Sequence, residues 1–237
     1  MSKTNSFLIN NSSLEEMLNW AKKRIISGPD PISGAKKKEF LDKELGNTIS
    51  KKGIGWKKTF DLFINTIVPS TRPFDHPTSL AFVAAAPTPA ASSIDAVLGA
   101  AEIFAGNWDG GSGAIYAENE ALKWLAKLAK WPTKTSGGVF VSGGTLGNLS
   151  AIHAARTNYQ LISKTKSKKL SILCSSEAHS SLYAIAKVMD FKILEVKSNV
   201  KGKIDIKEAK KIINKNKNIF CIVANAGATN SGAIDNI

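Results

Sequence analysis

The sequence predicts an α/β fold built on a doubly wound parallel sheet, and two observations support this prediction. From about residue 138 onward, short apolar runs alternate strictly with segments of helical period, and this alternation is typical of parallel sheets. Loops rich in glycine and hydroxyl side chains follow the expected strands. Because such sheets bind ligands at the carboxyl ends of their strands, we expect a ligand site at that edge.

The first 75 residues carry helical patterns and no strand pattern. One apolar stripe at helical spacing follows Ser12 and Ser13, with acidic residues in its first turn, and ends at residues 28–34; its members are Leu14, Met17, Leu18, Ala21 and Ile25. A second stripe ends at Pro69 and comprises Phe60, Phe63, Ile64 and Ile67. Two amphipathic helices cannot form a core alone, so residues 1–75 are expected to be a helical arm whose stripes need other cover.

Residues 76–91 are small, apolar and interrupted by proline, which predicts a packed irregular segment. Helical period returns at residues 94–101 and again at 122–128. Beyond these, strands are expected at residues 138–142, 170–174, 191–196 and 219–224, and helices at about 146–163, 179–189 and 206–214. The two cysteines, Cys174 and Cys221, fall in expected strands, which indicates buried thiols and no disulfide framework.

The formal net charge of +13 raises the possibility of nucleic-acid binding. Lysine supplies nearly all of it, since the only arginines are Arg24, Arg72 and Arg156, and base recognition favours arginine. We interpret the charge as a solvated lysine-rich surface and expect no nucleic-acid partner. Three well-separated histidines predict no metal site. No apolar run reaches the length of a membrane span and the start has no apolar signal core, so a cytoplasmic protein without membrane association is expected.

Three loops follow the expected strands, and the first has the properties of a phosphate site. Residues 142–148 read Ser-Gly-Gly-Thr-Leu-Gly-Asn and precede a helix. Glycines allow close approach of an anion, the helix start offers unpaired N–H groups and a positive dipole end, and Thr145 adds a hydroxyl. The glycine spacing fits neither the P-loop nor the dinucleotide pattern, and taken alone such a turn is as often only a tight turn.

The second loop, residues 175–181, reads Ser-Ser-Glu-Ala-His-Ser-Ser and places His179 at a helix start on the same sheet edge. A lone histidine there can cap the helix or face solvent, but an imidazole can also stack on a planar heteroaromatic ring. The third loop, residues 224–235, is rich in small and hydroxyl side chains that leave room for a ligand. A plain loop of turn formers is the alternative interpretation for Asn230, Ser231 and Gly232.

In this order and spacing, the three loops resemble those of the group II pyridoxal-phosphate-dependent decarboxylases, which include the aromatic-amino-acid, glutamate, histidine and diaminobutyrate enzymes. Upstream, the resemblance extends to His76-Pro77, Pro89-Ala90 and a helix from Glu118 to Trp131. It covers roughly residues 55–237 and is weak in the first 50. It implies that residues 76–237 are the first, incomplete part of an aspartate-aminotransferase-like large domain (fold type I), and that the arm of residues 1–75 forms a homodimer.

The resemblance also implies site residues. Gly144 and Thr145 would hold the phosphate of pyridoxal 5′-phosphate, His179 would stack on its pyridine ring, and Thr229 would lie near the ring and its oxygen substituents. His179 and Thr229 would therefore serve catalysis as well as cofactor binding.

Phe82 and Val83 would line the substrate pocket. The family has larger or more polar residues where this chain has Val83 and alanines at 84–86, so the amino acid that serves as substrate cannot be read across.

The implied activity is decarboxylation of an L-amino acid. It also needs a lysine that forms a Schiff base with the cofactor, usually directly after a histidine, and an aspartate that pairs with the pyridine nitrogen. The three histidines here precede Pro77, Ala154 and Ser180, so both residues are expected beyond residue 237 and the chain is expected to be an incomplete, inactive fragment. The alternatives are a related lyase or transaminase of the same fold, and a non-catalytic remnant that binds a phosphate-bearing ligand or a partner chain.

Overall fold

The computed structural model describes residues 9–49, 51–82, 85–164 and 169–236. The chain folds as two compact units, unit 1 (residues 1–118) and unit 2 (residues 119–237). The division that the sequence predicts after residue 75 is one of function, between a dimer-forming arm and a cofactor-binding domain. That division stays a prediction.

Unit 1 is helical throughout its regular elements. Its helices are α1 (Asn11–Ser27), α2 (Lys38–Leu45), α3 (Trp56–Leu62), a π-helical turn (Phe63–Ile67), a 3-10 turn (Val68–Ser70) and α4 (Pro89–Ala100). Helix α5 (Trp108–Leu128) has a non-helical residue at Gly111 and crosses the boundary between the units. The helical pattern predicted for residues 1–75 is therefore confirmed over the described residues, whereas the charge-rich α2 was not expected.

Helix α1 begins slightly earlier than the sequence suggested. The Oδ1 atom of Asn10 accepts the N–H of Ser13 at 2.9 Å and its hydroxyl at 2.6 Å, so Asn10 is the N-cap. The helix therefore includes both Ser12 and Ser13, and the prediction of acidic residues in the first turn was wrong. The helix ends at Gly28 as predicted, where φ is 75° and the N–H donates to the Arg24 carbonyl at 3.1 Å.

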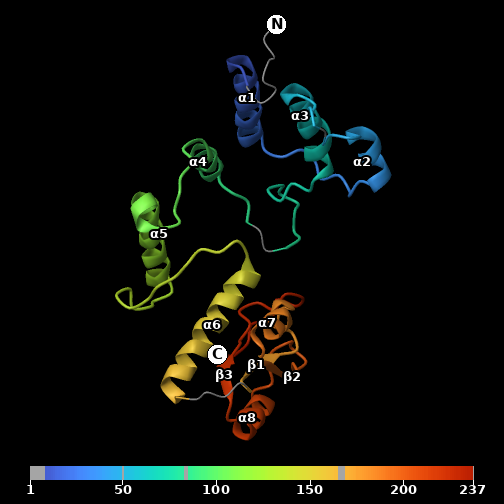
Figure 1. The fold of residues 1–237 in the computed structure, drawn as a ribbon. Helices are drawn as coiled ribbons and strands as arrows, with labels where there is room; N and C mark the ends of the chain where they lie inside the picture. Colours follow the sequence, from blue (N-terminus) through green and yellow to red (C-terminus); the bar gives the residue numbers. More distant parts are fainter. Residues whose placement is uncertain (1–8, 50, 83–84, 165–168, 237) are drawn as a thin grey trace. The chain divides into compact units, whose positions relative to one another are not determined.

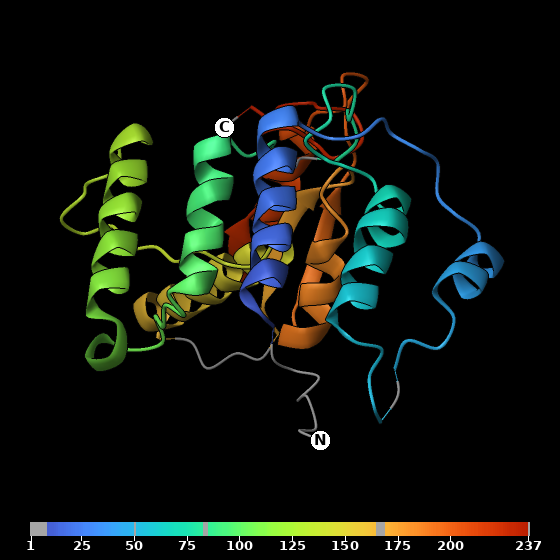
Figure 2. The same ribbon diagram turned by 90° about the horizontal axis from the view of Figure 1, so that it is seen from above.

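The apolar stripes of unit 1 are only partly covered. Trp20 packs edge-on against Phe60 and Phe63, with ring centroids 6.2 and 6.0 Å away, and Phe60 is buried. Helix α1 lies between α3 and α4 (Figure 2). Even so, exposed apolar side chains remain along these helices: Leu14, Leu18, Ile26, Phe63 and Ile67.

Residues 71–82 and 85–88 are irregular, as predicted, but they are not packed. The side chains of Leu80 and Phe82 are exposed, so the expected burial of this segment was wrong. The segment ends sooner than expected because the Thr88 hydroxyl caps α4 by accepting the N–H of Ala91 at 3.2 Å. Phe82 has a positive φ of 66° and its ring lies 5.8 Å from that of Phe74. Val83 lies outside the described residues.

Unit 2 alternates strands and helices, as predicted. Its helices are α6 (Gly144–Ser163), α7 (Ser181–Met189) and α8 (Ile206–Lys215), and its strands are β1 (Ser171–Ser175), β2 (Lys192–Val196) and β3 (Ile219–Ile222). The strands form a parallel sheet in the order β2-β1-β3 (Figure 1). The α/β class with a parallel sheet is confirmed.

The strand predicted at residues 138–142 is absent. These residues adopt no regular structure, and Val139 and Phe140 are exposed. The local apolar pattern is that of a buried strand, but a strand forms only by pairing, and no described segment pairs with it.

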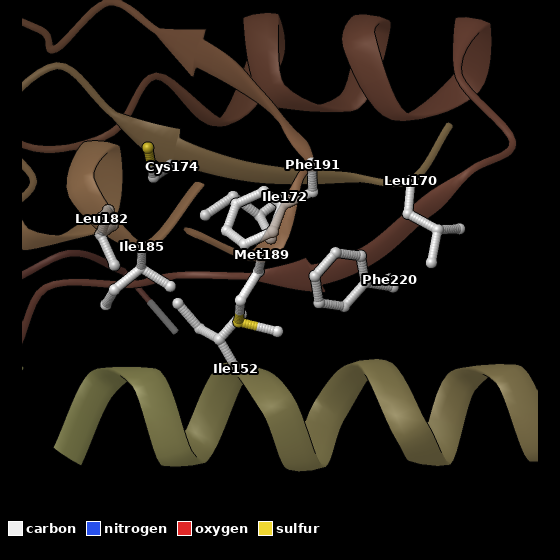
Figure 3. Close-up of a cluster of buried hydrophobic side chains, with 9 residues drawn as sticks. All are labelled: Ile152, Leu170, Ile172, Cys174, Leu182, Ile185, Met189, Phe191 and Phe220. Atoms are coloured by element: carbon white, nitrogen blue, oxygen red, sulfur yellow. The ribbon is translucent and has the colours of Figure 1, made fainter. Parts of the chain in front are cut away.

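Helices cover both faces of the sheet. Helices α6 and α7 cover one face with a cluster that Figure 3 shows in close-up: Ile152, Leu170, Ile172, Cys174, Leu182, Ile185, Met189, Phe191 and Phe220. The rings of Phe191 and Phe220 meet edge-on, with centroids 5.5 Å apart. Helix α8 covers the other face through a smaller cluster: Leu173, Val196, Ile204 and Ala209. Both faces of β1 are therefore buried, as expected for a central parallel strand.

Both cysteines are free thiols in strands, as expected. Cys174 is fully buried, and this burial raises the pKa of its thiol to about 11, whereas Cys221 is half-buried. In the ranges that the structure describes, no three His, Cys, Asp or Glu side chains gather into a group that could hold a metal. No helix in those ranges is both long and apolar enough to cross a membrane.

Candidate functional site

The carboxyl-end edge of the sheet brings together the loops singled out in the sequence. Ser175 ends β1 and the chain then enters the loop before α7, while the loop after β3 begins beyond Ile222. The start of α6 lies at this same edge, because the Asn148 side-chain amide donates to the Ser181 hydroxyl at 3.0 Å. That bond joins the fifth residue of α6 to the first residue of α7.

The start of α6 offers unpaired hydrogen-bond donors. The N–H groups of Leu146 and Gly147 both donate to the Gly143 carbonyl at 3.1 Å, whereas those of Gly144 and Thr145 have no partner among the described residues. The unpaired N–H groups that the sequence predicts at the start of this helix are therefore those of Gly144 and Thr145. A Cβ atom built on Gly143 or Gly144 would meet no atom within 4 Å, and Gly144 and Thr145 are exposed, so the helix start has the room that an anion site requires.

His179 combines both interpretations that the sequence allowed. Its Nδ1 atom accepts the N–H of Ser181 at 3.1 Å, so the imidazole caps the start of α7. A ring nitrogen that accepts carries no proton, so the neutral imidazole holds its proton on Nε2. The side chain remains exposed and can also present its ring face and its Nε2–H group to a ligand.

The third loop is a short hairpin with Thr229 near its tip. The N–H of Ala228 donates to the Ala233 carbonyl at 2.9 Å, and the N–H of Asp235 donates to the Asn225 carbonyl at 2.8 Å. The Asn225 side-chain amide donates to the Ser175 hydroxyl at 2.9 Å, which ties the hairpin to the end of β1. Thr229 is exposed.

The structure therefore joins three of the predicted site segments along one edge. The start of α6 and the His179 loop are linked through Asn148, and the Thr229 hairpin is linked to β1 through Asn225. The functional roles of Thr145, His179 and Thr229, and their convergence on one cavity, stay predictions. Phe82 belongs to unit 1, and its expected role with Val83 in a substrate pocket also stays a prediction.

Sequence reasoning missed the residues that hold these loops. Asn148, Ser175 and Asp235 stand at the ends of the three loop motifs, and Asn225 stands inside one, but none was given a role. Asp235 is only 4% exposed and accepts two backbone N–H groups. The sequence did carry one indication that Asp235 has a supporting role. A carboxylate that directly follows an apolar residue such as Ile234 is a candidate for burial, and buried acids are rare unless they are paired.

Comparisons with known proteins agree with this architecture. The family model for the pyridoxal-dependent decarboxylase conserved domain matches residues 43–237. An aromatic-L-amino-acid decarboxylase of Bacillus atrophaeus is 28% identical over 214 residues, which cover 87% of this chain and 44% of the relative. The chain thus spans about half the length of the curated relatives that it matches.

Solved structures show the same fold. The glutamate decarboxylase domain of a diaminobutyrate-pyruvate transaminase and L-2,4-diaminobutyrate decarboxylase from Vibrio parahaemolyticus superposes with a TM-score of 0.80 at 23% identity, covering 99% of this chain and 55% of that one. Oryza sativa TDC, solved with PLP and tryptamine, gives a TM-score of 0.79 at 19% identity, covering 96% of this chain and 54% of that one. At these identities the likeness establishes the fold.

Proposed function

Because this chain belongs to the pyridoxal-dependent decarboxylase family, we propose that the start of α6 holds the phosphate of pyridoxal 5′-phosphate. The observation that carries the proposal is the pair of unpartnered N–H groups of Gly144 and Thr145, two exposed residues at the start of a helix of 20 residues. A phosphate monoester is largely dianionic at neutral pH, with a second pKa of about 6. Its charge is stabilised by the positive end of the helix dipole as well as by the two donors.

The residues around this position fit the rest of the cofactor. The imidazole of His179 supplies a flat face for stacking and an Nε2–H donor, because Nδ1 is already engaged by the N–H of Ser181. The Thr229 hydroxyl supplies a hydrogen-bond donor for the ring's oxygen substituents. When bound, the cofactor provides the electron sink that accepts the charge left by departing CO₂. The chain's own contribution is to fix the phosphate and to orient the ring.

We extend the proposal to the activity of the whole protein, which is decarboxylation of an L-amino acid. The substrate side chain is left open, because the relatives that the chain matches differ in the amino acid given in their names. We also propose that a second subunit covers the exposed apolar side chains of α1 and of the π-helical turn after α3, which agrees with the exposure of Leu14, Leu18 and Phe63.

These 237 residues are proposed to bind the cofactor without catalysing decarboxylation. No histidine in the sequence precedes a lysine, which supports the proposal that the reactive lysine and the ring-pairing aspartate expected for the family are not among these residues. An enzyme accelerates its reaction by at least about 10⁶-fold, or about 8 kcal/mol of barrier. Interactions with the phosphate stabilise ground state and transition state alike, so they cannot supply that difference.

The test uses 4′-deoxypyridoxine 5′-phosphate, which lacks the aldehyde and so cannot react with surface lysines. Gly144→Pro removes one N–H donor at the first helical position, where proline fits the backbone. A hydrogen bond to a charged group contributes about 1.5–3 kcal/mol, so the dissociation constant measured by calorimetry should rise at least about tenfold. Gly144→Ala is the matched control because it keeps the N–H group, and it should weaken binding less.

Thr145→Ala should weaken binding by several-fold, whereas Thr157→Ala, an exposed position in the middle of the same helix, should leave the affinity unchanged. CO₂ release from L-amino acids by the chain should stay at the level of free pyridoxal phosphate. Wild-type affinity in the Gly144→Pro variant would contradict the assignment of the phosphate to α6.

A further inference from the structure

We propose that the turn of residues 198–204, which lies between β2 and α8, is a brace that positions the Thr229 hairpin, and that buried Asp235 is the positioning residue that joins the two. The inference deepens the proposed function, because it assigns a support to one of the predicted cofactor-binding residues. It is carried by two independent contacts between the turn and the hairpin.

The first contact is made by the Asp235 carboxylate, whose two oxygens bind different segments. Oδ1 accepts the N–H of Ile204 at 2.7 Å, and Oδ2 accepts the N–H of Asn225 at 2.7 Å. The side chain is 4% exposed, so these bonds are shielded from water. Because the Asn225 side chain binds the Ser175 hydroxyl at the end of β1, one carboxylate ties the turn and the base of the hairpin to the sheet edge.

The second contact is steric. Gly202 has a φ of +71°, and a Cβ atom built on it would lie 3.2 Å from both the Ala233 Cβ and the Ser231 Oγ. The turn therefore packs directly against the returning half of the hairpin, at a distance that only a glycine permits without displacement. Ser231 lies in the same turn as Thr229, and Ala233 follows that turn, so we expect a shift at these two residues to move Thr229.

The turn is rigid enough to act as a support. Residues Ser198 and Ile204 form an antiparallel bridge, and the N–H of Asn199 donates to the Lys203 carbonyl at 2.8 Å. The Asn199 side-chain oxygen also accepts the N–H groups of Lys201 and Lys203, at 2.9 and 3.2 Å. The turn is thus closed by its own hydrogen bonds, independently of the hairpin.

The hairpin is built from turn formers and is exposed at most of its positions, with Ala228 buried. An antiparallel bridge between Ala226 and Ile234 and two bonds across its tip close it: Ala228 N–H to the Ala233 carbonyl and Gly232 N–H to the Ala228 carbonyl. A segment with few buried apolar contacts and exposed backbone bonds opens easily. The brace therefore decides how well Thr229 is positioned, although the turn itself contributes no group to the ligand.

The test compares Asp235→Asn and Gly202→Ala with the matched control Asp205→Asn. Asp205 also accepts two backbone N–H groups, those of Lys207 and Glu208 at the start of α8, but neither belongs to the hairpin. Amide hydrogen exchange followed by mass spectrometry should be about tenfold faster at residues 225–234 in both brace variants. In Asp205→Asn the acceleration should be confined to the first turn of α8.

Ligand binding provides the second measurement. The affinity for 4′-deoxypyridoxine 5′-phosphate should fall several-fold in both brace variants, and Thr229→Ala should add little to the loss because the hydroxyl is already displaced. Protection of the β1 amides against hydrogen exchange serves as the folding control. If Asp235→Asn loses this protection, the test of the brace rests on the milder variant Gly202→Ala.

Two outcomes would contradict the brace proposal. One is an unchanged exchange rate at residues 225–234 in a brace variant that is folded, and the other is an equal acceleration at those residues in Asp205→Asn. These outcomes are distinct from failure of the proposed function. If the wild-type chain does not bind the cofactor analogue but the exchange pattern is as expected, the brace stands and the cofactor assignment falls. If the analogue binds and exchange in the hairpin is unaffected, the cofactor assignment stands and the brace falls.

Discussion

Both units contain apolar runs that need to be covered, but among the described residues only unit 2 buries all five residues of such a run. In unit 2, all five residues of β1 are buried, because α6 and α7 cover one face of the sheet and α8 covers the other. In unit 1, the one buried residue that α1 contributes is Ser13, and Leu14, Leu18 and Ile26 are exposed. An apolar stripe thus indicates that a surface requires cover, but it does not indicate whether the same unit supplies that cover.

This comparison predicts a large difference between two identical substitutions. Ile172 in β1 is 0% exposed, and Ile26 in α1 is 71% exposed. Ile172→Ala should lower the free energy of unfolding of unit 2 by about 2–5 kcal/mol, because it leaves a cavity in a closed core. Ile26→Ala should change that of unit 1 by no more than about 0.5 kcal/mol.

Native-state hydrogen exchange can measure both effects, with peptides from β1 reporting on unit 2 and peptides from α1 reporting on unit 1. A loss of stability in Ile26→Ala comparable to that in Ile172→Ala would show that the exposed stripe is already covered in solution. The difference in apolar coverage between the two units would then hold for a single subunit but not for the protein as it is assembled in solution.

The strands β1 to β3 and the helices α6 to α8 of unit 2 could be predicted from sequence, because their apolar runs pack into the two clusters on the faces of the sheet. Residues 138–142 show the limit of such reasoning. Their pattern is that of a strand, but a strand also needs a partner, and pairing is not encoded locally. Helix α2 (Lys38–Leu45) shows the opposite case, since it has no buried residue and so leaves no apolar stripe to recognise.

In the candidate site, too, some features could be predicted from the sequence and others could not. The loops that carry Thr145, His179 and Thr229 could be predicted from composition and from their place after expected strands, although the strand expected before Thr145 does not form. Their supports were not found, because a bond such as that between Asn225 and Ser175 joins residues 50 positions apart. Likewise, only the fold reveals that Gly202 must be small, since its neighbours Ser231 and Ala233 come from another segment.

Alkaline pH should weaken unit 2 selectively through two groups on adjacent elements. Burial raises the pKa of the Cys174 thiol from 9.0 to about 11, and a hydrogen bond to the Glu195 carboxylate raises the pKa of Tyr183 from 10.0 to about 12. Both pKa values are raised, so the folded state favours the protonated forms. Their contribution to stability is complete below about pH 9 and is lost as the pH rises toward 11 and 12.

For Cys174 a shift of this size corresponds to about 3 kcal/mol. The stability difference between the wild type and Cys174→Ala, measured by urea unfolding, should be constant up to pH 9 and then shrink toward pH 11. Tyr183→Phe should show the same trend about one pH unit higher. A difference that does not change with pH would mean that folding does not raise the pKa of these groups.

The smallest expected effect belongs to unit 1 and appears at acid pH. The guanidinium of Arg24 donates to Asp75 at 2.8 Å, joining α1 to the segment before His76. This hydrogen bond lowers the pKa of Asp75 below 3.8 and raises that of Arg24. Because the folded pKa of Asp75 is depressed, its contribution is present above about pH 4 and is lost as the pH falls through the folded value.

Asp75→Asn should therefore destabilise unit 1 by at most about 1 kcal/mol at pH 7 and by nothing near pH 2, as read from exchange in peptides of α1 and of residues 71–82. Asp42→Asn is the control, since Asp42 pairs with Lys38 within α2 and both side chains are well exposed. That pair joins neighbours four residues apart, so its loss should leave the rest of unit 1 unaffected. A loss in Asp75→Asn as large as that in Ile172→Ala would reverse the comparison between the units. It would mean that a single ion pair holds the helices of unit 1 together, and that the exposed apolar stripes of unit 1 need no second subunit to cover them.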